Sequence, residues 1–266
     1  MLNFRFKTYW KLFWKFRKIH LMRTLEYRGD LYFWSLISTI WTLFSLLFFD
    51  LLTQTGSIGG WERHEVLLLI GVFSILDAFT WSVFYHNMRE YTRAVFSGEF
   101  NQYLTKPINT QFLIMTQSNS FNNFPRLIIG GVIMHRSLVA LNYQPSFWQV
   151  ISFLGLLSLA GLFIYLVWFI FATLAFWFEK LDNINDIIPS LRQIWQVPRS
   201  VYTGVTSLIL TIILPLGLMT SIPTEVLLGK ASVNWIIYFV VITFICFIFS
   251  QIFFKISIKK YSGAGN

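Results

Sequence analysis

The sequence predicts an all-α membrane protein with six transmembrane helices, and three observations lead to this prediction. Only 12% of the 266 residues are charged, whereas ordinary soluble domains carry about 25%. The mean hydropathy is +0.59, and aromatic residues make up 19% of the chain, a composition that suits surfaces facing lipid. Six apolar runs are each about 18 residues or longer, which is enough to cross a hydrocarbon core of roughly 30 Å.

Five of these runs are uninterrupted, and the third is not. The uninterrupted runs predict helices at residues 31–52, 66–85, 147–178, 201–221 and 234–254. The apolar part of the third run, residues 127–141, is short and contains His135 and Arg136. We therefore begin the third helix near Phe112. Its polar residues are expected to face protein, because the hydrocarbon core offers them no hydrogen-bond partners.

The distribution of Lys and Arg predicts the orientation of these helices. One side of the predicted membrane carries Arg5, Lys7, Lys11, Lys15, Arg17, Lys18, Arg23, Arg28, Arg89, Arg93, Lys106, Lys180, Arg192, Arg199, Lys255, Lys259 and Lys260. The other side carries Arg63, Arg136 and Lys230. Basic residues accumulate in cytoplasmic segments, so both termini are predicted to be cytoplasmic. The net charge of +9 is thereby explained without a nucleic-acid partner, which we do not expect.

Residues 1–30 predict an amphipathic helix in the membrane interface. Lys7, Lys11, Lys15 and Lys18 fall on one side of a helical wheel. Much of the opposite side is apolar, with Arg17 interrupting it, and consists of Phe6, Tyr9, Trp10, Leu12, Phe13, Phe16 and Ile19. This pattern suits lysines that contact anionic headgroups, either in a plain membrane anchor or in a lever that contacts a cytoplasmic partner. The transmembrane domain follows at residues 31–258, and residues 259–266 form a cytoplasmic tail.

The chain carries no pattern for catalysis, for a cofactor or for a metal ion. The stretch Gly229-Lys230-Ala231 lacks the hydroxyl group and the preceding glycine of a phosphate-binding loop. His64-Glu65 is not followed by a second histidine at zinc-binding spacing, and no serine lies in a Gly-x-Ser-x-Gly turn. With Cys246 as its one cysteine, the chain cannot form an intrachain disulfide. Catalysis within this chain is not expected.

Asp77 is the ionisable residue nearest the centre of an uninterrupted run. A carboxyl group at that depth is energetically costly, so it indicates a functional group with a partner inside the bundle. A structural hydrogen bond at a helix contact is the alternative. Arg126 and Arg136 can serve as partners only if the third helix packs against the second.

The end of the fifth predicted helix is interrupted by prolines and glycines. Pro215, Gly217, Pro223 and Gly229 lie in an otherwise apolar stretch. Proline removes a donor and breaks the helical hydrogen-bond ladder, so the stretch predicts a kink followed by a short re-entrant hairpin. Such a backbone persists at membrane depth only when it is buried in protein or lines a cavity. A simple kinked helix end is the alternative.

Three motifs follow one another along the chain. The first, Gly98, Phe100, Asn101, Leu104 and Pro107, approximates a pattern Gly-x-Leu-Asp-x-x-Leu-x-x-Pro, with Asn in place of Asp and Phe in place of the first Leu. The second is Pro215-Leu216, Ile222-Pro223 and Leu227-Leu228-Gly229 in the fifth predicted helix, and the third is the ending Tyr261-Ser262-Gly263-Ala264-Gly265. With these motifs in this order the chain resembles the permease subunits of type-2 ATP-binding-cassette exporters, in the small bacterial branch of daunorubicin and viologen exporters. The resemblance covers about residues 20–265.

The resemblance implies a location in the bacterial cytoplasmic membrane and several partners. These are two copies of an ATPase subunit, which would hold ATP and Mg²⁺, a second permease subunit that is identical or related, and membrane lipid. It also implies a coupling helix at about residues 98–109. Gly98 permits the turn, Pro107 ends the helix, and Phe100, Tyr103 and Leu104 can share one face. We expect this face to dock on the ATPase together with Glu99 and Asn101.

The expected function is that of the membrane subunit of an ATP-driven exporter, which moves an amphiphilic or hydrophobic substrate by alternating access. Trp41, Phe73, Asp77 and Trp81 are the candidates for lining the pathway, which the resemblance places along the first, second and fifth helices. The alternative function is an ATP-independent secondary carrier or channel. Inverted repeats or several intramembrane charges would favour that alternative. An intramembrane enzyme lacks a catalytic constellation.

Overall fold

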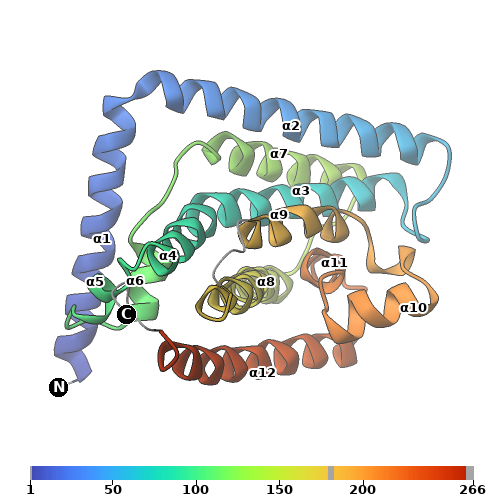
Figure 1. Ribbon diagram of the computed structural model, residues 1–266. Coiled ribbons are helices and arrows are strands. Elements are labelled where there is room, and N and C mark those ends of the chain that lie inside the picture. The colour runs from blue at the N-terminus through green and yellow to red at the C-terminus, as the bar shows by residue number, and fades with distance from the viewer. Residues whose placement is uncertain (1, 179–182, 262–266) are drawn as a thin grey trace.

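The computed structural model describes residues 2–178 and 183–261, and within these ranges every regular element is a helix (Figure 1). Four helices are long and apolar enough to cross a membrane. They are α2 (Arg28–Gln54), the continuous helix Arg63–Phe96, the helix Phe147–Phe176, and α12 (Val233–Ile258). A bent pair of helices raises the number to five if it forms one span. The all-helical membrane protein is confirmed, whereas length and composition support four or five spans in the described residues rather than six.

Two of these long helices consist of several elements. The helix Arg63–Phe96 comprises α3 (Arg63–Thr80), the π-helical turn η1 (Trp81–Tyr85) and α4 (His86–Phe96). The helix Phe147–Phe176 comprises α8 (Phe147–Thr173) and the 3-10 turn η2 (Leu174–Phe176). Ser146 caps α8 by accepting a hydrogen bond from the Gln149 backbone, and the Gln149 side chain accepts one from the Ser146 backbone. This reciprocal pair satisfies two backbone donors that the first turn would otherwise leave free.

The third predicted helix is broken. Residues 110–116 form α6 (Thr110–Thr116), residues 124–140 form α7 (Phe124–Ala140), and the segment between them is not helical. Asn87 of α4 holds this segment, because its amide donates to the carbonyls of Met115 and Ser118 and accepts from the Ser118 backbone, each at 2.8 Å. Pro125 then starts α7, a position where its missing donor costs nothing. The prediction of one continuous third helix that begins near Phe112 is therefore wrong.

The connection between the fourth and fifth predicted helices also differs from our prediction. Residues 184–201 form four short turns, η3 (Ile184–Asp186), α9 (Ile187–Leu191), η4 (Arg192–Gln196) and η5 (Arg199–Val201). At one end Asn185 donates to Thr92 of α4 at 2.6 Å, and at the other Ser200 donates to the carbonyl of Gly59, just before α3, at 2.6 Å. The segment therefore runs along the whole helix Arg63–Phe96. Arg192 and Arg199, which we assigned to a cytoplasmic connection, lie along the bundle instead.

The fifth predicted helix is bent by 80°. Its first arm consists of α10 (Gly204–Ser207) and the π-helical turn η6 (Leu208–Ile213), and its second arm is α11 (Leu218–Leu227). Pro215 and Gly217 lie in the break between the arms, Pro223 lies inside α11, and Gly229 ends the second arm with φ +69°. A Cβ atom on Gly229 would lie 2.8 Å from both the Tyr143 hydroxyl group and the Gln149 amide, so this turn requires glycine.

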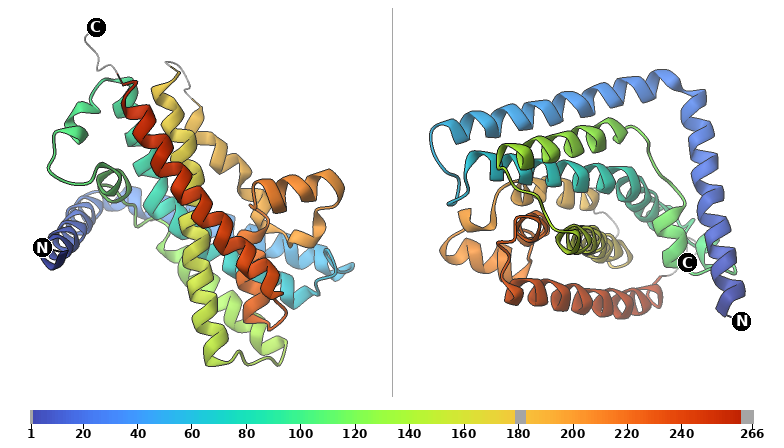
Figure 2. Two further views of the ribbon diagram at one scale, coloured as in Figure 1. Left: turned by 90° about the horizontal axis from the view of Figure 1, so that it is seen from below. Right: turned by 180° about the vertical axis from the view of Figure 1, so that it is seen from behind.

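Helix α3 occupies the centre of the molecule and packs closely on α7. A Cβ atom on Gly71 of α3 would lie 2.9 Å from the carbonyl oxygen of Gly130 in α7, so the two backbones meet through small residues. Every residue of α11 is buried. Figure 2 shows α8 and α12 side by side on the side of the bundle away from α2.

Both described ends of the chain lie at one end of the bundle. The Tyr261 hydroxyl group donates to the carbonyl of Gly98 at 2.8 Å, and the backbone of Asn109 donates to the Tyr9 hydroxyl group at 3.1 Å. Helix α1 (Leu2–Glu26) crosses this end and runs in a different direction from α2 (Figure 1). We call this the terminal end; it holds α1, the 97–109 connection and Tyr261.

Candidate transport site and coupling connection

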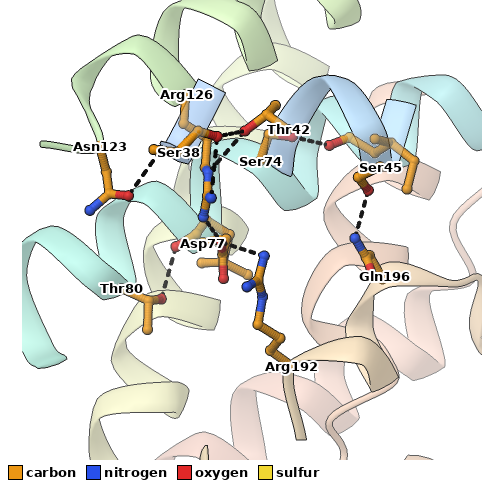
Figure 3. A network of polar contacts seen from close by, with 12 residues as sticks. Ser38, Thr42, Ser45, Ser74, Asp77, Thr80, Asn123, Arg126, Arg192 and Gln196 are labelled. Carbon is orange, nitrogen blue, oxygen red and sulfur yellow. Dashed lines mark hydrogen bonds and ion pairs between the residues drawn. The ribbon is translucent and has the colours of Figure 1, made fainter. Parts of the chain in front are cut away.

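A buried cluster of three charged side chains joins separate parts of the chain. Asp77 of α3 is 1% exposed, and Arg126 of α7 forms an ion pair with its Oδ2 atom. Arg192 of η4 approaches the same oxygen, with its Nη2 atom at 3.2 Å (Figure 3). Of the two partners considered possible from the sequence, Arg126 forms the pair, whereas Arg136 is exposed on α7.

Hydrogen bonds extend this cluster to α2. Arg126 donates from Nε to the Thr42 hydroxyl group at 3.0 Å and from Nη2 to the Ser38 carbonyl at 3.5 Å. Ser38 donates to the Asn123 side chain at 3.1 Å. Gln196 of η4 donates to Ser45 of α2 at 2.7 Å (Figure 3). The network therefore ties α2, α3, α7 and η4 together.

The charge of this cluster is not balanced within the described residues. The other ion pairs there join one cation to one anion: Arg63 with Asp50 at 2.7 Å, Arg199 with Glu225 at 2.8 Å, and Lys230 with Glu65. Asp77 instead faces two guanidinium groups. Arginine remains protonated in proteins, so one positive charge stays uncompensated when Asp77 is ionised.

Arg192 also borders an open cleft of about 620 Å³ between α2 and residues 189–197. Its side chain is 28% exposed. Aromatic residues of α2 form one wall, namely Trp41, Phe44, Phe48 and Phe49. The other wall carries the polar side chains Ser190, Arg192, Gln193 and Gln196. The cleft is therefore apolar on one side and cationic on the other.

The predicted pathway residues divide between this cleft and the protein interior. Trp41 is 58% exposed and lines the cleft. Phe73 is buried beneath Arg192, whose guanidinium carbon lies 5.6 Å from the centre of the Phe73 ring. Asp77 is buried in the cluster, and Trp81 of η1 lies against Tyr85 with 4.4 Å between ring centres. The sequence prediction missed Arg192, because prolines and polar residues interrupt the apolar pattern of its segment.

The 97–109 connection is anchored from inside the chain. Gly98 makes the turn after α4 with φ +77°. Phe100 is 0% exposed and packs against Phe176 and Tyr261, with ring centres 5.1 and 5.4 Å apart. The Phe100 side chain therefore faces the bundle and does not share an exposed face with Leu104. The sequence pattern showed an apolar face but not which surface it covers.

The side of the connection that faces away from the bundle consists mainly of exposed residues. Its helix α5 (Asn101–Leu104) has only four residues. Glu99, Asn101, Leu104 and Pro107 are exposed, together with Gln102 and Lys106. Tyr103 is half-buried and its hydroxyl group accepts a hydrogen bond from Gln117. Burial raises the pKa of Tyr103, so this phenol is neutral at physiological pH.

Helix α1 lies against the segment that follows this connection. Arg17 donates to the carbonyl of Thr116 at 2.6 Å, at the end of α6, and His20 contacts the carbonyl of Gln117 at 2.6 Å. The rings of Tyr9 and Phe112 meet edge to face with centres 4.7 Å apart. The predicted amphipathic helix thus contacts residues 109–118 of its own chain.

A comparison with protein families gives one match. The model for the family described as "ABC-2 family transporter protein" matches residues 39–265, which is most of the chain. No curated protein and no solved structure matches.

Proposed function

We propose, from the premise that this chain belongs to the ABC-2 family of transporter proteins, that it is the membrane subunit of an ATP-driven exporter. The family match over residues 39–265 is the observation that carries the proposal. Membership of the family implies association with an ATPase of the ATP-binding-cassette type. ATP and Mg²⁺ would bind to that partner, since this chain has no phosphate-binding loop in its sequence. The expected complex contains two ATPase copies and a second permease subunit.

The geometry at the terminal end supports mechanical coupling. The exposed surface of the 97–109 connection is available to a partner, while Phe100 fixes the connection to the bundle. The connection follows directly on the continuous helix Arg63–Phe96, which carries Asp77. Closure of the ATPases would therefore displace α4 and, through the continuous helix, α3. The π-helical turn η1, a form frequent at functional sites, is a place where this helix can bend.

This proposal places the terminal end in the cytoplasm of a bacterial cell. Most basic residues of α1 and of the 86–109 region lie there, which agrees with the excess of Lys and Arg in cytoplasmic segments. Helix α1 would lie along the inner leaflet with its lysines toward lipid headgroups. The substrate would enter between α2 and the 189–197 segment. It would leave at the end of the bundle opposite the terminal end.

An ATP-independent carrier is the second candidate function. The Asp77, Arg126 and Arg192 cluster supports it, because intramembrane charges mark ion-coupled pathways. The family match favours the ATP-driven exporter over it.

Gentle solubilisation of the tagged chain from its native membrane distinguishes the two candidates. We expect an ATPase with Walker motifs to co-purify, and we expect export by cells to stop when ATP is depleted. A chain that purifies without an ATPase, together with export that survives ATP depletion but stops when the proton gradient collapses, would establish the carrier instead.

A further inference from the structure

We propose that the cleft between α2 and residues 189–197 binds an amphiphile with one anionic group. The anionic group pairs with Arg192, and the apolar chain lies against the aromatic wall of α2. This inference rests on the proposed function, since it names the chemical class that the membrane subunit recognises.

One positive charge of the Asp77 cluster is uncompensated, because a single carboxylate faces two guanidinium groups. Arg126 is buried and also bonded to Thr42 and Ser38. Within the described residues, the one polar contact of the Arg192 guanidinium group is that with Asp77 at 3.2 Å. A guanidinium group has five donors, so Arg192 retains capacity for another partner. An excess cation in a medium of low dielectric is costly, and an anion that pairs with it removes this cost.

The composition of the cleft also suits an anion. Its lining contains no Asp or Glu among the described residues, and Arg192 is the charged residue in that lining. Gln193 and the second amide proton of Gln196 can donate further hydrogen bonds to anionic oxygens, whereas the Ser190 hydroxyl group already donates to the Asp186 carbonyl. Planar guanidinium groups bind carboxylate, phosphate and sulfonate oxygens through paired hydrogen bonds.

An apolar wall formed by aromatic residues of α2 lies opposite Arg192 in the cleft. Trp41 and Phe44 meet edge to face with ring centres 6.1 Å apart, and Phe44 stacks on Phe48 at 6.4 Å. All three side chains are exposed in the described structure. A cleft of about 620 Å³ falls in the roughly 300–1,000 Å³ range of sites for small organic ligands. An aromatic wall beside a cationic one matches a molecule with an apolar chain and an anionic end.

Two permanently charged probes test the charge preference. The purified chain, in nanodiscs of phosphatidylcholine, is titrated with a brominated alkyl sulfonate and with a brominated alkyl trimethylammonium of the same chain length. Bromine quenches nearby indoles, and subtracting the signal of a Trp41→Phe variant isolates the fluorescence of Trp41. We expect the sulfonate to quench Trp41 at a mole fraction at least about tenfold lower than the ammonium. Equal quenching by both probes would overturn the proposal.

Arg192→Gln tests the role of the arginine, and it leaves a balanced Asp77–Arg126 pair that favours correct folding. We expect this variant to lose most of the preference for the sulfonate over the ammonium probe. Lys230→Gln, at the opposite end of the bundle, should keep that preference. Retention of the preference by Arg192→Gln would overturn the proposal. Competition by added phosphatidylglycerol would identify the occupant as a bilayer lipid. If phosphatidylglycerol does not compete with the sulfonate, the occupant is another amphiphile. Both results support the site. Binding needs no ATPase, so this test can fail while the exporter proposal stands.

Discussion

At the scale of a single residue, Asp77 joins α3 to α7 and η4, because its carboxylate faces both Arg126 and Arg192. Its depth in an apolar run predicted a partner inside the bundle, and Arg126 is that partner. The second partner could not be predicted, because Arg192 belongs to a segment whose prolines hide its passage along α3. Local sequence indicates that a buried charge needs compensation, but the packing of distant segments decides which residues provide it.

Asp77→Asn should destabilise the protein strongly. The change leaves the buried guanidinium group of Arg126 and the partly exposed one of Arg192 without a carboxylate. Breaking a buried pair in this way costs about 3–5 kcal/mol. Thermal unfolding of the purified chain in detergent measures the effect. Asp50→Asn is the matched control, since its pair with Arg63 is largely exposed, and its unfolding temperature should change much less. Equal shifts for the two variants would contradict the structural role of the Asp77 cluster.

At the scale of elements, the regular helices were predictable and the irregular ones were not. The predicted helices at 31–52, 147–178 and 234–254 correspond to α2, to α8 with η2, and to α12, because long apolar runs between polar ends leave no other solution in lipid. Residues 184–201 could not be predicted, because they form four short turns instead of one helix. Contacts with distant segments hold these turns: the Arg199 backbone donates to the Ser221 side chain, and the Trp195 carbonyl accepts from Thr220. The break at 117–123 depends likewise on Asn87, which is distant in sequence.

Arg17→Ala should loosen the attachment of α1 to the segment around α6. The guanidinium group satisfies the Thr116 carbonyl at the end of α6, and hydrogen bonds to charged groups contribute roughly 1.5–3 kcal/mol. Hydrogen exchange of amides 110–118 should therefore accelerate about tenfold or more. Lys15→Ala, a change at an exposed position of the same helix, should leave it unchanged. Identical exchange in both variants would show that Arg17 does not hold this segment.

At the scale of the whole molecule, the terminal end and the charged cluster are linked by one helix. The helix Arg63–Phe96 connects the 97–109 connection to Asp77, and the network around Asp77 connects it to α2, α7 and η4. A displacement at the terminal end would thus reach the walls of the cleft. The sequence placed the connection and the buried acid separately; their linkage became visible only in the packed structure.

The most direct test of the coupling account is a site-specific cross-link to the ATPase. In a Cys246→Ser background, Gln102→Cys on the exposed connection and Ser232→Cys at the opposite end each receive a maleimide benzophenone. The account predicts an adduct with the co-purified ATPase from position 102 and none from position 232. An adduct from position 232, or none from position 102 in a complex that contains the ATPase, would contradict it.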